Sequence, residues 1–185
     1  TINDLYTDLQ GYIESTEENG YHSGMYTSAS FILLDLLKKT SIIKKEYSIK
    51  VIGHSLGAGM SAILVIQLKL LLQNHNIHAW NFATPPCCTL QSAQNYEKLI
   101  TNFVNEENIV PRLSLENLYY FKNLYLFLKD KKNEKPEPKD DKNLFIPGTI
   151  YYIYKNDKII KCGITKAEYL YEITPQQNLL EHNPR

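Results

Sequence analysis

The sequence is short of the features that several protein classes require. Its 185 residues carry 20 Lys and Arg against 20 Asp and Glu, so the formal net charge is zero. A nucleic-acid-binding surface needs an excess of basic side chains to displace counterions, so we expect no nucleic-acid partner. The three cysteines include the adjacent pair Cys87 and Cys88, and they follow neither a disulfide pattern nor a zinc-binding spacing. Composition therefore indicates no metal site.

Long hydrophobic runs are also absent. The richest apolar stretch, residues 62–72, is interrupted by Gln67 and Lys69 and is shorter than the ~20 residues that a membrane-spanning helix needs. The chain starts at Thr1 with no initiator Met, signal peptide or transit segment, so we expect a fragment of something larger. Its length and its 43% hydrophobic content predict a single globular domain with a sizeable core.

What the sequence does have is an alternation of helix-like and strand-like patterns. Helices are predicted at 31–39, 56–73, 89–99 and 115–128, the last with Ser114 as its N-cap, and strands at 48–52, 77–83 and 100–105. Two β-rich runs, 149–154 and 159–164, flank an Asn-Asp turn and predict a β-hairpin. This order predicts an α/β fold with a mostly parallel sheet and a late antiparallel hairpin.

One segment departs from this pattern. Residues 129–143 read KDKKNEKPEPKDDKN, with almost no apolar side chains and two prolines. Such a composition predicts a solvated, disordered insert within the single domain of residues 1–185. Two interpretations stay open, a surface linker and a regulatory flap beside a functional site.

The segment IKVIGHSLGAGM, residues 49–60, contains a Gly-x-Ser-x-Gly pattern formed by Gly53, Ser55 and Gly57. A predicted strand precedes the serine and a predicted helix follows it, as in a nucleophile elbow. We expect a Cβ at either glycine to collide with the neighbouring strand or helix. The turn would direct Ser55 Oγ out of the sheet and place the Leu56 amide beside a developing oxyanion. The pattern therefore predicts that Ser55 is a nucleophile, against the alternative of a simple packing turn.

A serine nucleophile needs a general base, which follows it in the chain in this type of site. Of the five histidines, His22 precedes the serine, and His54 is expected to point into the core or toward a backbone carbonyl. His75 and His78 flank the second predicted strand, where solvent-facing or structural roles are expected. Chain order and elimination leave His182, near the C-terminus, as the predicted general base.

Several other segments, taken with GHSLGAG, match a known family pattern. They are the Pro-Pro step in NFATPP (81–86), VPRLSLENL (110–118), PGTI (147–150), HSGM (22–25) and a terminal Glu-His-x-Pro (181–184). With these motifs the chain resembles the class 3 (fungal-type) lipase family, and within it the sn-1-specific diacylglycerol lipases. The match spans nearly all of the chain except the charged insert.

The resemblance implies an α/β-hydrolase fold, with helices on both faces of the central sheet. It also implies a serine hydrolase that cleaves ester bonds of acylglycerols through an acyl-enzyme, without a metal or cofactor. The implied partner is an acylglycerol lipid at a membrane or lipid-droplet surface. For localisation, it favours a cytosolic domain attached to or near a membrane, with secretion as the alternative.

The chain departs from the family pattern at the expected acid. The family places an aspartate directly before the Val-Pro turn, and this chain has Asn108 there. Asparagine carries no charge to stabilise an imidazolium, and the comparable change in the serine-protease triad costs about 10⁴ in kcat. Glu107 is a possible substitute acid, as is Glu106, although solvated loop charges are the alternative for both.

A second departure concerns the oxyanion hole. The family's Arg-Gly-Thr strand end, which supplies one donor, would lie just before Thr1, so we expect the N-terminal strand of the sheet to be missing. Leu56 is then the recognisable oxyanion donor, and losing one donor typically costs about 10² to 10³ in rate. The alternative hypothesis is a catalytically impaired lipase-like protein that binds lipid or a protein partner.

Overall fold

The computed structural model describes residues 13–16, 19–39, 43–44, 46–105, 108, 110–112, 144–153 and 159–162. In chain order the elements are β1 (Ile13–Thr16), β2 (Asn19–His22), α2 (Ser23–Leu37), β3 (Ile49–His54), α3 (Leu56–Leu71), β4 (Ile77–Phe82), α4 (Leu90–Asn95), η2 (Glu97–Leu99), β5 (Ile100–Asn105), η3 (Val110–Arg112), β6 (Thr149–Ile153) and β7 (Ile159–Cys162). The predicted helix at 115–128, its N-cap Ser114 and the charged insert at 129–143 lie outside the described residues.

The central sheet has five strands in the order β3-β4-β5-β6-β7. The first three pairings are parallel, and β6 pairs with β7 antiparallel. A separate antiparallel hairpin joins β1 to β2. The predicted mostly parallel sheet and the predicted late hairpin are therefore both confirmed. Because β3, β4, β5 and β6 are parallel, their carboxyl ends share one edge of the sheet.

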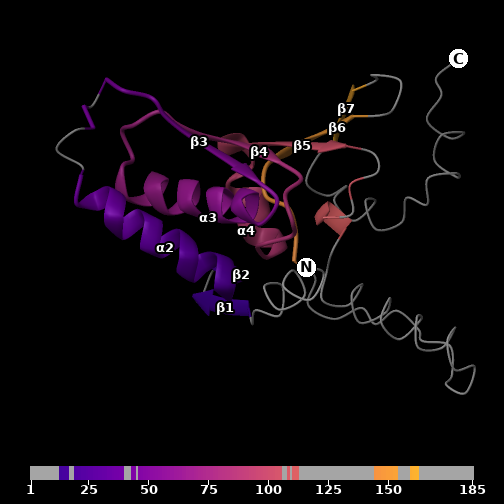
Figure 1. Ribbon diagram of the computed structural model, residues 1–185, viewed down its shortest axis with the longest axis horizontal. Helices are drawn as coiled ribbons and strands as arrows, with labels where there is room; N and C mark the ends of the chain where they lie inside the picture. The colour runs from indigo at the N-terminus through magenta and orange to yellow at the C-terminus, as the bar shows by residue number, and fades with distance from the viewer. Residues whose placement is uncertain are drawn as a thin grey trace, which may run out of the picture.

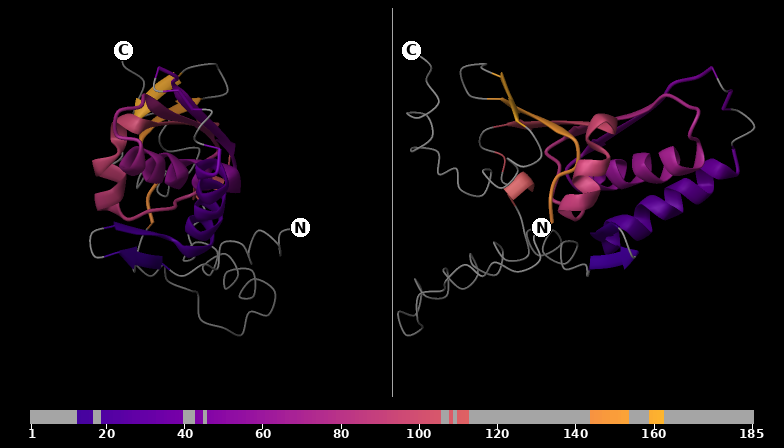
Figure 2. Two further views of the ribbon diagram at one scale, coloured as in Figure 1. Left: turned by 90° about the vertical axis from the view of Figure 1, so that its left-hand side faces the viewer. Right: turned by 180° about the vertical axis from the view of Figure 1, so that it is seen from behind.

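The described helices form layers on one side of this sheet (Figures 1 and 2). Helix α3 packs against β3 and β4, and α2 packs against α3. Among the described elements, none covers the opposite face. Within the same residues, no helix combines the length and the apolar character needed to cross a membrane.

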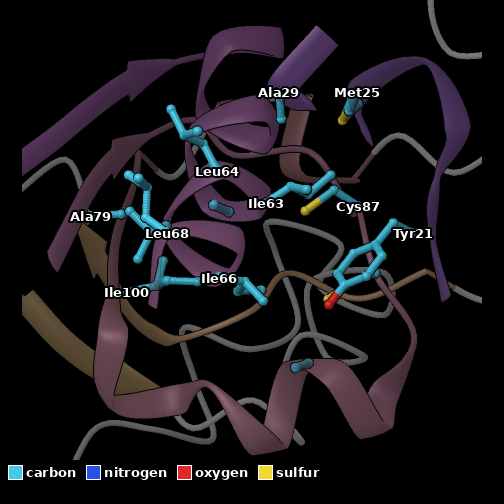
Figure 3. Packing of buried hydrophobic residues seen from close by; sticks show 14 of the residues in the cluster. Tyr21, Met25, Ala29, Ile63, Leu64, Ile66, Leu68, Ala79, Cys87 and Ile100 are labelled. Atoms are coloured by element: carbon cyan, nitrogen blue, oxygen red, sulfur yellow. The ribbon is translucent and has the colours of Figure 1, made fainter. Parts of the chain in front are cut away.

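Helix α3 is almost uniformly apolar because it is enclosed by the sheet on one side and by α2 on the other. Figure 3 shows Leu68 of α3 beside Ala79 of β4, with Ile63 on the side of Met25 and Cys87. A Cβ added at Gly59 would lie 2.5 Å from the Met25 sulfur, so the absence of a side chain lets α2 approach α3 closely. The predicted buried helix is confirmed, although it ends at Leu71.

Two predicted helices have different bounds in the structure. Helix α2 begins at Ser23 rather than at residue 31, because His22 caps its N-terminus by accepting from the Met25 amide through Nδ1 at 3.4 Å. The predicted helix at 89–99 is divided: α4 ends at Asn95, and a 3₁₀ turn follows Tyr96, whose φ of −115° and ψ of 20° are not helical.

Candidate active site

Ser55 lies in a sharp turn between β3 and α3. Its φ of 56° and ψ of −128° fall in a region that non-glycine residues rarely adopt, and such a conformation costs about 1–3 kcal/mol. Its amide donates to the Phe82 carbonyl at 3.0 Å, and its carbonyl accepts from the Ala58 amide at 2.8 Å. The turn is therefore held by β4 on one side and by α3 on the other, as a nucleophile elbow requires.

The two glycines that flank the serine differ in how much space a side chain would have. A Cβ at Gly53 would lie 2.3 Å from the Gly57 carbonyl oxygen and 2.6 Å from Ala58 Cα, which confirms the predicted collision at this position. A Cβ at Gly57 would meet nothing within 4 Å, so the same prediction is wrong there. The strand passes directly beneath the first turn of α3 at Gly53, whereas the space beside Gly57 is open.

The N-terminus of α3 begins one residue after the serine. Leu56 and Gly57 belong to the first helical turn, whose amides have no partner within a helix. The helix dipole adds partial positive charge at this end. Backbone donors therefore lie beside Ser55, although the role of Leu56 as oxyanion donor stays a prediction.

Asn108 follows β5, and Ser55 follows β3, so both lie beyond the carboxyl edge of the parallel sheet. The Asn108 amide donates to the Asn105 carbonyl at 2.9 Å. Its side-chain Oδ1 accepts from the Val110 amide at 3.0 Å, which forms an Asx turn. The side-chain oxygen thus fixes the loop, and the other terminal atom, Nδ2, is a donor only.

The remaining predicted catalytic residues are not placed by the structure. His182, Glu106 and Glu107 lie outside the described residues, and their roles stay predictions.

The other histidines have different surroundings. The prediction that His54 points into the core is wrong: the side chain is exposed, because strand alternation from buried Gly53 turns it to the opposite face. His22 is buried as the N-cap of α2. His78 Nε2 lies 2.9 Å from Thr101 Oγ1, and burial lowers its pKa. His75 is half-buried in the loop before β4.

A buried polar network beneath the sheet edge was not foreseen from sequence. The Asn102 side chain accepts from Thr84 Oγ1 at 2.7 Å and donates to the Pro147 carbonyl at 2.7 Å. It thereby ties the loops after β4 and before β6 to the centre of β5. The available signal was a polar residue at a core-facing strand position, two residues from Ile100 and from Val104.

Asn81 is the neighbour of Asn102 across the sheet and also pairs in register with Gly53. It is fully buried, and neither of its side-chain polar atoms has a hydrogen-bond partner in the part of the chain that the structure describes. This site at the centre of the sheet is also absent from the sequence predictions.

The buried Cys88 offers no competing nucleophile. Burial raises the pKa of the Cys88 thiol well above its ordinary value, and its Sγ donates to the Phe145 carbonyl at 3.6 Å. A protonated thiol is a poor nucleophile. In the described part of the chain, no group of three His, Cys, Asp or Glu side chains is arranged to hold a metal ion.

Comparison with known proteins gives consistent matches. Residues 1–118 match the family model described as Lipase (class 3). The chain is 30% identical over 136 residues to human diacylglycerol lipase-alpha and 28% identical over 130 residues to mouse diacylglycerol lipase-beta, which is 64% of this chain in both cases. The alignments span only 13% and 19% of those relatives.

Among solved structures, the chain is similar to a triacylglycerol lipase whose catalytic centre is formed by a serine-protease triad. The TM-score is 0.67 at 18% identity, over 98% of this chain and 65% of the other. That similarity shows the fold, and the expected α/β-hydrolase architecture is confirmed. The family-model match extends over more than half of the residues. The chain therefore belongs to the class 3 lipase family.

Proposed function

We propose that this domain hydrolyses a carboxylic ester bond of an acylglycerol, with Ser55 as the nucleophile. The observation that supports this most directly is the strained Ser55 turn between β3 and α3, which is the geometry of a nucleophile elbow. The proposal treats residues 1–185 as one catalytic domain. The named relatives are diacylglycerol lipases, and the solved neighbour is a triacylglycerol lipase.

The proposed reaction has two halves. Ser55 Oγ bonds to the ester carbonyl carbon while His182 takes its proton, and the carbonyl electron pair moves to the oxygen beside the Leu56 amide. When this intermediate collapses, the bond to the glycerol oxygen breaks and that oxygen takes the proton from His182. Water then attacks the acyl-enzyme in the same way and releases the fatty acid.

The acid of the triad is the member that departs from the family pattern, because Asn108 occupies its position. With Oδ1 holding the Val110 amide, the side chain has no negative charge to offer the imidazolium that forms on His182. A carboxylate at Glu107 would restore this charge, and we retain it as the substitute acid. The expected consequence is a slow hydrolase.

A fluorophosphonate probe tests the nucleophile, because it labels only an activated serine. We expect labelling of the protein and loss of the label in Ser55→Ala. Ser61→Ala is the matched control, because Ser61 is a buried serine on α3, the helix that follows Ser55, and this variant should keep the label. Labelling that persists in Ser55→Ala, or that never occurs in the whole protein, would contradict the proposal.

Asn108→Asp tests the acid. Aspartate supplies the same turn-forming oxygen and adds a negative charge, so hydrolysis of a short-chain acylglycerol should rise. The triad comparison sets the scale at up to about 10⁴ in kcat. If Glu107 already serves as the acid, the gain will be small and Glu107→Gln will abolish activity.

A second candidate function is favoured by the same residue. A family member without an acid would bind an acylglycerol, or a protein partner, without cleaving it. Absence of both labelling and hydrolysis in the Asn108→Asp variant, combined with retained binding of a non-hydrolysable acylglycerol ether, would favour this function. For the hydrolase, and for a member that binds an acylglycerol, the ligand is a lipid, and we propose that the domain works at a membrane or lipid-droplet surface.

A further inference from the structure

The loop after β4 lies beside the Ser55 turn and is strained in the same way. Its first residue, Ala83, has a φ of 55°, and Ser55 has a φ of 56°. In the described part of the chain these are the two non-glycine residues with a positive φ. They follow β3 and β4, which pair in the sheet, so two strained turns are neighbours at its carboxyl edge. Backbone strain of this kind persists where the surrounding contacts hold it.

The two turns share one peptide group. The Ser55 amide donates to the carbonyl of Phe82 at 3.0 Å, and this carbonyl belongs to the peptide group between Phe82 and Ala83. Because a peptide group is planar, the carbonyl turns whenever the group turns. The position of the serine backbone therefore depends on how this one peptide group is held.

Strand β5 holds the other side of the same peptide group. The Ala83 amide donates to the Phe103 carbonyl at 3.0 Å. The in-register pairing of β4 with β5 ends at Phe82 and Phe103. The chain beyond Ala83 therefore needs an attachment other than the sheet ladder.

Thr84 supplies that attachment through its side chain. Its Oγ1 donates to Asn102 Oδ1 at 2.7 Å, and both residues are fully buried. Asn102 in turn donates through Nδ2 to the Pro147 carbonyl at 2.7 Å. A short hydrogen bond between buried groups is costly to break, because the partner left behind has no water to replace it. The hydroxyl thus ties the loop firmly to the centre of β5.

The next residue of the loop contacts α3. A Cβ added at Gly59 would lie 3.3 Å from Pro85 Cγ, so the loop and the start of the helix are close together there. The loop is therefore held between β5 and the helix whose first turn follows Ser55. Packing alone would be served by valine, which has the shape of threonine without the hydroxyl.

We propose that Thr84 is a positioning residue for the nucleophile. Its hydroxyl, bonded to Asn102, fixes the loop after β4 and thereby holds the Ser55 turn in the orientation that attack on an ester requires. This rests on the proposed function for the role of Ser55, whereas the connection between loop and serine is independent of catalysis. Misplacement of a reacting group by about 1 Å can cost about 10²-fold in rate.

Thr84→Val tests the proposal, because it keeps the volume and removes the hydroxyl. For hydrolysis of p-nitrophenyl butyrate we expect kcat to fall by about tenfold to a hundredfold. KM should not change, because the hydroxyl is buried against Asn102. Thr84→Ser restores the hydroxyl and should keep kcat within about threefold of the wild-type value. A raised KM with an unchanged kcat, or a serine variant as slow as the valine variant, would overturn the proposal.

Thr101→Val is the matched control. It makes the same chemical change one residue from Asn102, at a hydroxyl that lies 2.9 Å from His78 Nε2. Strand alternation places this side chain on the opposite face of β5 from Asn102. We therefore expect an unchanged kcat in Thr101→Val. Equal losses of kcat in Thr84→Val and Thr101→Val would refute a specific role for Thr84.

Hydrogen exchange of the Ser55 amide, measured by NMR, reports on the connection without any reaction. In Thr84→Val this amide should exchange about tenfold faster or more, since the loop has lost one buried restraint. Thr84→Ser and Thr101→Val should leave it unchanged. If circular dichroism shows that Thr84→Val does not fold, the wild-type protein decides. A Ser55 amide that exchanges much faster than the Ala83 amide would then refute the proposal, because the loop would be held without holding the serine.

The two readouts also separate this proposal from the proposed function. Unchanged Ser55 exchange in Thr84→Val, together with Ser55-dependent fluorophosphonate labelling, refutes the positioning role and leaves the hydrolase intact. Faster exchange in Thr84→Val, with neither labelling nor hydrolysis by the wild-type protein, refutes the hydrolase and leaves the connection between Thr84 and Ser55 intact.

Discussion

The two faces of the central sheet are built from the same strands but follow different rules. Toward α3 the strands present small and aliphatic side chains, such as Gly53, Ala79 and Ile100, all of them buried. Toward the other side they present wide rings, such as those of Trp80 and Phe103, that lie against one another. On the face toward α3, the size of the side chains is limited because a helix backbone lies close to the strands. On the other, side chains of neighbouring strands pack among themselves.

The difference indicates at which positions of the sheet a substitution is tolerated. Where β3 passes beneath the first turn of α3, a single added carbon meets backbone atoms that have no alternative position. On the opposite face, the atoms around each ring belong to other side chains, which can rotate. We therefore expect substitutions to cost much more on the face of α3, and the following predictions test that expectation in order of decreasing effect.

The largest effect is expected at Gly53. In Gly53→Ala the new Cβ would lie 2.3 Å from the Gly57 carbonyl oxygen, so α3 has to move away from the sheet. We expect a loss of about 3 kcal/mol or more in the free energy of unfolding, at the upper end of the range for overpacking. Urea denaturation measures it. Gly57→Ala is the control, because the space there is open, and a loss as large as that of Gly53→Ala would refute the explanation.

An intermediate effect is expected for one aliphatic substitution made on each face. Ile150 is fully buried on β6, and Ile150→Ala should cost about 2–5 kcal/mol in the free energy of unfolding. Ile52 is 71% exposed on β3, so the contacts described here predict that Ile52→Ala costs less than about 1 kcal/mol. Denaturant midpoints of the two variants give the comparison directly. A cost at Ile52 close to that at Ile150 would contradict the expected difference between the two faces.

The smallest effect is expected from His78, which lies on the face of the sheet opposite α3. Burial lowers its pKa below the ordinary 6.5, so the folded protein favours the neutral ring. The unfolded chain then takes up the proton first. Stability should therefore be constant above pH 6.5 and should fall as the pH decreases below that value. In His78→Gln, urea midpoints on either side of this pH should differ less than in the wild type. An equal pH dependence in the variant would assign the effect to another group.

The Ser55 turn was predictable because its signals are local. Gly53, Ser55 and the apolar helix that follows lie within a few residues, and the strain at the serine arises from that short stretch. The mostly parallel sheet and its late hairpin followed from the same kind of evidence, because each strand has a local pattern of its own. The prediction of a serine hydrolase then followed from the Gly-x-Ser-x-Gly motif and from the family resemblance.

Features that depend on strand register were not predictable in the same way. The hydrogen bonds of Asn102 join it to Thr84 and Pro147, which are remote in sequence and meet only once β5 is aligned with its neighbours. The exposure of His54 and the open space at Gly57 depend likewise on which way one strand or helical turn faces. The early start of α2 depends on a cap from His22, a residue that the sequence places in the HSGM motif and excludes as the base.

The Asx turn at Asn108 has one further consequence. The turn uses a single side-chain oxygen, and an aspartate would present an oxygen of the same geometry at the same place. The Asx turn in the loop after β5 can thus form whether or not residue 108 carries a charge. Exchange of the amide for a carboxylate, or the reverse, therefore keeps this turn. The charge at position 108 can therefore be changed by substitution without removing the turn that holds the loop.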